Sequence, residues 1–101
     1  MLNQIVIVGR LVNEMVVKEA EDGKKVANIT LACPRSYKNS EGEYDTDFIN
    51  FILWEGIAEN VSDYCKKGDI LGIKGRLQTT NGNLEAVAEK VTFLSSKKSE
   101  E

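Results

Sequence analysis

Residues 47–54 carry side chains whose chemistry can be interpreted from their spacing. Strand side chains alternate between two faces, so Phe48 and Trp54 share one face with the polar Asn50. The opposite face is apolar and contains Ile49, Phe51 and Leu53. Exposed aromatic rings can stack with nucleobases at about 1–3 kcal/mol per base, whatever the base, because every base has a π face. The alternative is that Phe48 and Trp54 are ordinary core or interface aromatics.

The composition offers few residues for a catalytic site with a nucleophile or for a metal site. The chain has two cysteines, Cys33 and Cys65, and no histidine. Histidine is the most common general base, and a structural zinc site uses four Cys or His ligands. Each cysteine lies in an apolar run, which predicts buried free thiols rather than a disulfide. We therefore expect no catalytic site, no metal and no cofactor, and hence a protein that is not an enzyme.

The charge balance is acidic, with 13 Lys and Arg against 16 Asp and Glu and a net charge of −3. Nucleic-acid-binding surfaces are usually basic, so the total charge gives no support for one. Many acids are nevertheless concentrated at residues 19–22, 41–47 and 100–101. Six basic residues remain candidate phosphate contacts, although each could equally be a solvated surface charge: Arg10, Arg35, Lys38, Lys67, Lys74 and Arg76.

Short apolar runs between turn residues predict a mostly β domain. Strands are expected at residues 5–17 with a bend or bulge at Gly9, and at 26–33, 47–54, 69–79 and 84–94. Asp22-Gly23 and Asn81-Gly82 predict hairpin turns. Pro34 predicts the end or an edge of the second strand, and the polar residues 36–46 predict an exposed loop.

Residues 56–67 change to a helical period, because Ile57, Val61 and Tyr64 with Cys65 fall on one helix face. Gly68 is placed as the glycine that ends this helix. An antiparallel sheet of three strands, a helix and two more strands is the layout of the OB fold. We therefore predict an all-β, five-stranded Greek-key barrel with one helix between strands 3 and 4. The domain is expected at residues 1–94, followed by a short polar tail at 95–101.

Several short motifs follow one another along the chain in a fixed order. They are residues 7–11 (IVGRL), 26–32 (VANITLA), 47–50 (DFIN), 58–61 (AENV), 75–79 (GRLQT) and 88–91 (AEKV). In order and spacing, these motifs resemble those of the bacterial single-stranded DNA-binding proteins over roughly residues 1–94.

This resemblance implies sequence-tolerant binding and protection of single-stranded DNA in replication, recombination or repair. It implies that Tyr37, Phe48 and Trp54 occupy the base-stacking positions, and that the protein is a homotetramer whose dimers pair through the first strand. Residues 5–8 are apolar on both faces and need cover on both. A self-pairing interface would supply that cover, and so would burial within one chain.

Three departures from the family pattern modify these expectations. Glu55-Gly56 replaces basic residues after Trp54, and the loop at residues 80–83 is short where the family has a long basic one. Both predict weaker binding or a shorter site. Residues 95–101 lack the phenylalanine of the family's acidic tail tip, which predicts no tail-mediated repair partners.

Two other functions remain open from the sequence. One is a dimeric primosome-type relative that contacts a helicase or another replication protein. The other is an OB-fold protein-interaction domain without nucleic-acid binding. No apolar run is long enough for a membrane span and no signal peptide is recognisable, so a cytoplasmic protein is expected.

Overall fold

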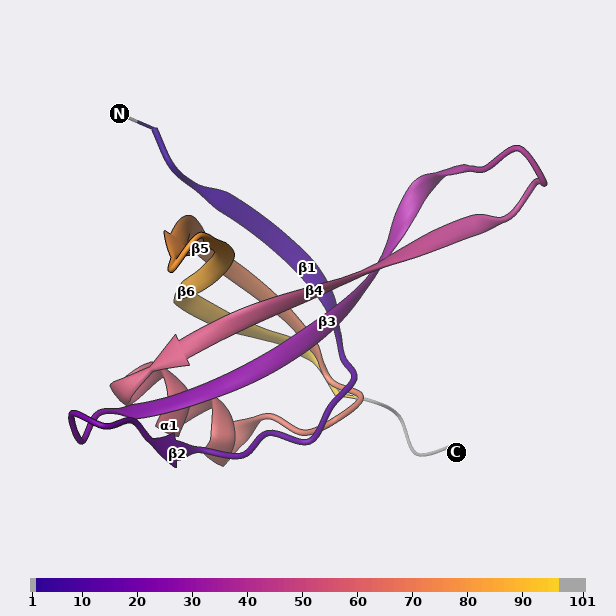
Figure 1. The fold of residues 1–101 in the computed structure, drawn as a ribbon. Coiled ribbons are helices and arrows are strands. Elements are labelled where there is room, and N and C mark those ends of the chain that lie inside the picture. Colours follow the sequence, from indigo (N-terminus) through magenta and orange to yellow (C-terminus); the bar gives the residue numbers. More distant parts are fainter. Residues whose placement is uncertain (1, 97–101) are drawn as a thin grey trace.

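β-branched and aromatic residues form long strands along most of residues 2–96, the part of the chain that this computed structural model describes (Figure 1). The elements in chain order are β1 (Ile5–Leu11), β2 (Lys18–Glu19), β3 (Lys25–Lys38), β4 (Tyr44–Trp54), α1 (Glu55–Tyr64), β5 (Ile70–Thr80) and β6 (Asn83–Ser95). Within the predicted tail, residues 97–101 lie outside the described part.

The five long strands close into a barrel in the order β1–β5–β6–β4–β3, and β3 then pairs with β1. Arg10 lies at the seam, because it pairs with Ala32 of β3 and with Ile70 of β5. The two-residue β2 is an addition along β3. The predicted five-stranded barrel, with one helix between its third and fourth strands, is therefore confirmed.

One strand pair differs from the antiparallel sheet that the sequence predicts. β4 and β6 run parallel, with Phe51 beside Ala86 and Ile52 beside Val87. Parallel neighbours need a crossover connection, and the chain makes it here through α1 and β5. The expectation of a fully antiparallel sheet is wrong at this pair. Turn signals identify hairpins, but they do not show which strands meet when a barrel closes.

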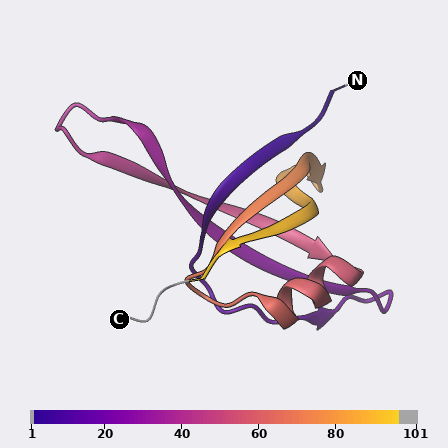
Figure 2. The same ribbon diagram turned by 180° about the vertical axis from the view of Figure 1, so that it is seen from behind.

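The barrel interior is filled by alternate residues of its strands. Phe51 and Leu53 of β4 are buried opposite Ile29 and Ala27 of β3, as the alternation predicts. α1 packs against β3, β4 and β6 at one end of the barrel (Figure 2). The buried core consists of Leu11, Ala27, Ile29, Leu31, Phe51, Leu53, Ala58, Val61, Leu71, Ile73 and Ala88.

The helix is shorter than the predicted residues 56–67 and ends at Tyr64, which is exposed rather than buried. The carboxylate of Asp69 accepts a hydrogen bond from the backbone N–H of Lys66 (2.8 Å). An aspartate that captures a backbone N–H in this way competes with helix formation, so residues 66–69 form a turn. Gly68, with φ of 102°, belongs to that turn, and its predicted role as the helix-terminating glycine is wrong.

The first strand ends at Leu11 instead of continuing to residue 17. Asn13 accounts for the difference, because its Oδ1 accepts from the Thr30 N–H (2.8 Å) and its Nδ2 donates to the Asn28 carbonyl (3.2 Å). The Asn13 side chain thus takes the place of backbone partners along β3.

β3 and β4 continue past the barrel as a projecting hairpin, here called the arm (residues 35–47; Figures 1 and 2). The predicted loop at residues 36–46 is wrong, because β3 extends to Lys38 and β4 begins at Tyr44. Pro34 pairs with Thr46, and the next pair is Lys38 with Tyr44, so a bulge lies between them. Proline is tolerated next to a bulge, and β3 therefore passes through Pro34 without ending.

Tight turns join the strands of each hairpin. At the tip of the arm, Asn39 Oδ1 accepts hydrogen bonds from the backbone N–H groups of Glu41 (2.8 Å) and Glu43 (3.0 Å). Asn81 and Gly82 join β5 to β6 with φ angles of 53° and 82°, which confirms the predicted Asn-Gly hairpin turn.

Candidate functional site

The outward face of β3 and β4 presents the predicted stacking residues Phe48 and Trp54. In the register of the two strands Phe48 lies opposite Ala32, Asn50 opposite Thr30 and Trp54 opposite Val26. The Phe48 side chain is 64% exposed, and Trp54 is half-buried. An open aromatic ring on a rigid strand is the kind of surface on which a base can stack.

A shallow pocket of about 100 Å³ lies on this face, between Phe48 and Trp54 in strand order. Asn28, Asn50 and Ile52 line it together with Leu84 and Glu85 of β6. The Thr30 hydroxyl donates to Asn50 Oδ1 (2.5 Å), which holds the amide in place and directs its N–H groups away from Thr30. The pocket lining is thus mixed, with apolar side chains beside the amides of Asn28 and Asn50 and the carboxylate of Glu85.

Tyr37 is exposed and lies apart from Phe48 and Trp54 along the β3–β4 pair. It lies on the arm, in the part of β3 where the register with β4 shifts between Pro34 and Lys38. The three predicted stacking residues therefore divide into two on the barrel and one on the arm.

A further aromatic residue, Tyr44, occupies the outward face of β4 at its arm end. Its cross-strand partner is Lys38, whose Nζ lies 5.8 Å from the centroid of the tyrosine ring. Tyr44 was not among the predicted stacking residues, because residues 36–46 were expected to form a loop. The signal that could have identified Tyr44 is its separation from Phe48 and Trp54 by an even number of residues. On one continuous strand, that separation places all three side chains on the same face.

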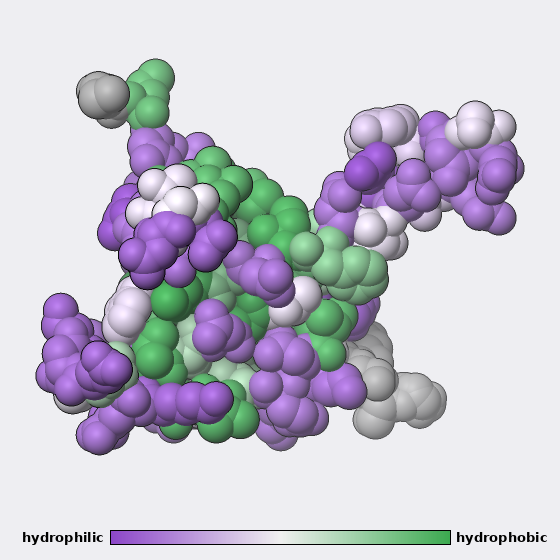
Figure 3. Space-filling model, in the orientation of Figure 1, coloured by the Kyte–Doolittle hydropathy of each residue, from purple (hydrophilic) through white to green (hydrophobic). Residues whose placement is uncertain are grey.

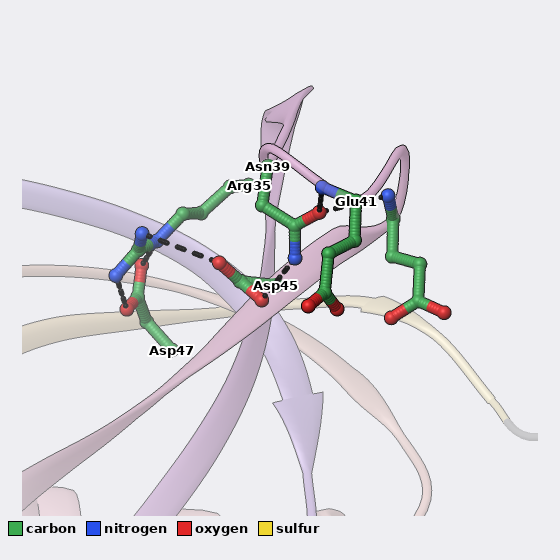
Figure 4. Close-up of polar contacts among 6 residues, drawn as sticks. Arg35, Asn39, Glu41, Asp45 and Asp47 are labelled. Atoms are coloured by element: carbon green, nitrogen blue, oxygen red, sulfur yellow. Dashed lines mark hydrogen bonds and ion pairs between the residues drawn. The ribbon is translucent and has the colours of Figure 1, made fainter.

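Arg35, a predicted phosphate contact, is held by carboxylates of the arm (Figure 4). Its Nε and Nη2 donate to the two oxygens of Asp47 (3.1 and 2.9 Å), and its Nη1 lies 3.7 Å from Asp45. Hydrogen bonding to Arg35 lowers the pKa of Asp47, and the same bonds raise the pKa of Arg35. In this state, much of the Arg35 charge is balanced within the arm itself.

Arg10 and Lys67 lie together at the seam of the barrel. They line a hollow of about 290 Å³, and Arg10 Nη1 donates to the Gly68 carbonyl (2.6 Å). An apolar groove of about 320 Å³ runs from Arg10 past Ala32 to Thr46. Because Ala32 lies opposite Phe48, this groove extends from the β3–β4 pair to Arg10, which also lines the hollow that contains Lys67.

Lys74 and Arg76 are on β5, away from the β3–β4 pair in strand order. Lys74 is exposed and lies opposite Lys90 of β6, a basic residue outside the six predicted phosphate contacts. Arg76 instead forms an ion pair with Glu89 (3.2 Å) and hydrogen-bonds to Gln78 (2.5 Å). Of this group, Lys74 and Lys90 are therefore better placed to meet a phosphate.

Cys33 and Cys65 are half-buried free thiols. Burial raises the pKa of both, so neither has the character of an activated nucleophile. Among residues 2–96, no group of three or more His, Cys, Asp or Glu side chains is arranged to hold a metal ion. In the same part of the chain, no helix is long and apolar enough to cross a membrane.

The chain is similar in sequence to bacterial single-stranded DNA-binding proteins. Residues 2–95 match the model of the single-strand binding protein family. The chain is 43% identical to single-stranded DNA-binding protein 3 of Listeria innocua over 96% of its own length, and 43% identical to single-stranded DNA-binding protein B of Bacillus subtilis over 91%. The names of these bacterial relatives describe binding and no reaction.

The relatives differ in length from this chain. The chain spans 66% of the Listeria innocua protein and 61% of a Halalkalibacterium halodurans relative, but 82% of the Bacillus subtilis protein. Among solved structures, the SSB domain of a Synechococcus protein superimposes with a TM-score of 0.74 at 20% identity, over 90% of this chain and 94% of that one. At this identity, the match concerns the fold.

Proposed function

Because this chain belongs to the single-strand binding protein family, we propose that it binds single-stranded DNA without base preference and protects it during replication, recombination or repair. The observation that carries the proposal is the outward face of β3 and β4, where Phe48 and Trp54 flank the Asn50 pocket. Bases stack on the two rings, and the Asn50 amide donates to the base between them. The protein acts in the cytoplasm, where a bacterial cell keeps its DNA.

Stacking supplies more of the affinity than charge does. Each stacked base contributes about 1–3 kcal/mol in related single-strand complexes. The net charge is −3, and both Arg35 and Arg76 are paired with carboxylates. Phosphates are contacted chiefly by Lys38 and by Arg10 with Lys67 at the end of the apolar groove. Few neutralised phosphates give a shallow dependence of affinity on salt.

The test uses Trp54, which is the single tryptophan of the chain. Titration with oligo-dT is expected to quench its fluorescence, because a stacked base lies against the indole. Replacement by alanine, Trp54→Ala, is expected to weaken binding of a labelled oligo-dT by about 1–3 kcal/mol, measured by anisotropy. Binding that is unchanged in Trp54→Ala, together with an unquenched wild-type protein, would show that this face does not bind DNA.

The protein assembles as a homotetramer through β1. Support comes from Val6 and Val8, which are 65% and 55% exposed on the outer side of β1. Leu94 of β6 adds to this strip, because both Val8 and Leu94 lie beside Gly72 of β5. In Figure 3, which has the orientation of Figure 1, hydrophobic residues (green) lie where Figure 1 draws β1. The arm, in contrast, is largely hydrophilic. Contiguous exposed apolar surface of this kind marks a protein interface.

A further inference from the structure

The arm presents a flat ring and a positive charge together. Tyr44 is 57% exposed at the start of β4. Lys38, opposite it on β3, holds its ammonium group 5.8 Å from the centre of the ring. A cation at this distance is attracted to the π face of the ring, so the two side chains form one unit.

This unit continues the outward face of β4 beyond the barrel. Side chains of a strand alternate, so Tyr44 falls on the same face as Phe48, with the small Thr46 between them. At roughly 3.3 Å per residue, Tyr44 lies about 13 Å along the strand from Phe48. A DNA strand that stacks on Phe48 and follows β4 outward therefore arrives at Tyr44.

The remaining charges of the arm restrict what this unit can bind. Glu41 and Glu43 at the tip repel phosphates, and Asp45 accepts a hydrogen bond from Asn39 Nδ2 (3.0 Å). Arg35 is engaged by Asp47, whereas Lys38 lies over the tyrosine ring. A base that stacks on Tyr44 and one phosphate near Lys38 match this distribution, whereas a run of phosphates along the arm does not.

We propose that Tyr44 and Lys38 form an additional nucleotide-binding position on the arm. The base stacks on Tyr44, and Lys38 contacts the adjacent phosphate. The inference rests on the proposed function and extends it, because only strands long enough to pass from the barrel to the arm occupy this position.

The experiment compares the full chain with Tyr44→Ala on two oligo-dT ligands, of about 6 and about 16 nucleotides, near the limits of a single OB-fold site. The variant is expected to bind the longer ligand about tenfold more weakly, which is the loss of one stacked base, and the shorter ligand as the wild type does. Tyr44→Phe keeps the ring and is expected to bind both ligands normally. Tyr64→Ala removes a tyrosine of α1 that is even more exposed, at 76%, and is the matched control.

Three results would overturn the arm position. The first is wild-type affinity of Tyr44→Ala for the longer ligand. The second is a loss of affinity that is equal for the two ligands, or one that Tyr64→Ala shows to the same extent. The third is a Tyr44→Phe variant as weak as Tyr44→Ala, since stacking does not need the hydroxyl. Trp54 quenching by the shorter ligand tests the barrel face separately. If neither ligand quenches Trp54, the proposed function fails, and the arm position fails with it.

Discussion

At the scale of single residues, Arg35 and Asp47 control how much positive charge the arm offers to DNA. The guanidinium group uses two of its nitrogens on Asp47. We expect Asp47→Asn to release Arg35 and to strengthen binding of oligo-dT. The slope of log K against log salt should steepen by about 0.7, the value for one additional phosphate on a single strand. Titrations at several salt concentrations measure both effects.

Asp22→Asn is the matched control for this variant. It also removes one negative charge, but at the turn before β3, where Asp22 Oδ2 lies 4.0 Å from Lys24 Nζ. Asp47, in contrast, lies in β4 where this strand leaves the arm and enters the barrel. An equal gain in affinity for Asp22→Asn and Asp47→Asn would mean that total charge, and not the release of Arg35, determines the effect.

The same pair determines how the arm responds to acid. Hydrogen bonding to Arg35 lowers the pKa of Asp47 below its ordinary value of 3.8. The folded-state pKa is thus below the unfolded-state value, so the contribution of the pair to stability is present above the unfolded-state pKa. It is lost as the pH falls through the lower, folded-state pKa. Denaturant titrations of wild type and Asp47→Asn should therefore differ by a constant amount near neutral pH and converge only below about pH 4.

At the scale of elements, the inward and outward faces of β4 could be predicted from the sequence alone. Phe51 and Leu53 point inward and Phe48 outward because the period of two is a property of any extended strand. The Asn81-Gly82 turn was predictable for a similar reason, since its positive φ angles suit those two residues.

The arm could not be predicted in this way. Residues 36–46 are polar because both faces of the arm meet solvent, and the pairing of Lys38 with Tyr44 depends on backbone hydrogen bonds that leave no hydrophobic pattern. Tyr44 was missed for that reason. The carboxylate partners of Arg35 and Arg76 were also missed, because they depend on cross-strand register, which only the folded chain defines.

The β6 backbone leaves no room for a side chain at Gly75 of β5. A Cβ atom there would overlap the carbonyl oxygen of Val87, at the point where the register shifts between Lys74 and Gly75. We expect Gly75→Ala to force the strands apart and to lower the free energy of unfolding by about 1–3 kcal/mol, as measured by denaturant titration. Gly72→Ala on the same strand should be tolerated, because its Cβ would lie 3.5 Å from Leu94 Cδ1, an ordinary contact. Equal losses in the two variants would contradict this explanation.

At the scale of the whole molecule, the apolar strip on β1 provides the test of assembly. Val6→Glu places a charge on an exposed position of that strip, so the barrel should fold normally while the assembly separates into smaller species. Light scattering measures the change in mass. Val16→Glu, at another exposed valine outside β1, should leave the assembly intact. An unmodified protein that is monomeric at micromolar concentration would contradict assembly through β1.

The seam of the barrel also has a consequence for the order of events during synthesis. β1 leaves the ribosome before the other strands, yet Ile5 pairs with Gly75 and Arg10 with Ile70. The β3–β4 hairpin can form while the chain is still growing, and Arg10 and Leu11 can pair with β3, but residues 5–9 of β1 must wait until β5 has emerged. Contacts between residues far apart in sequence form slowly, and unpaired apolar strands are prone to aggregation. Each nascent chain therefore carries the β1 backbone unpaired until β5 emerges, an interval in which a chaperone or the β1 of a neighbouring nascent chain can bind it.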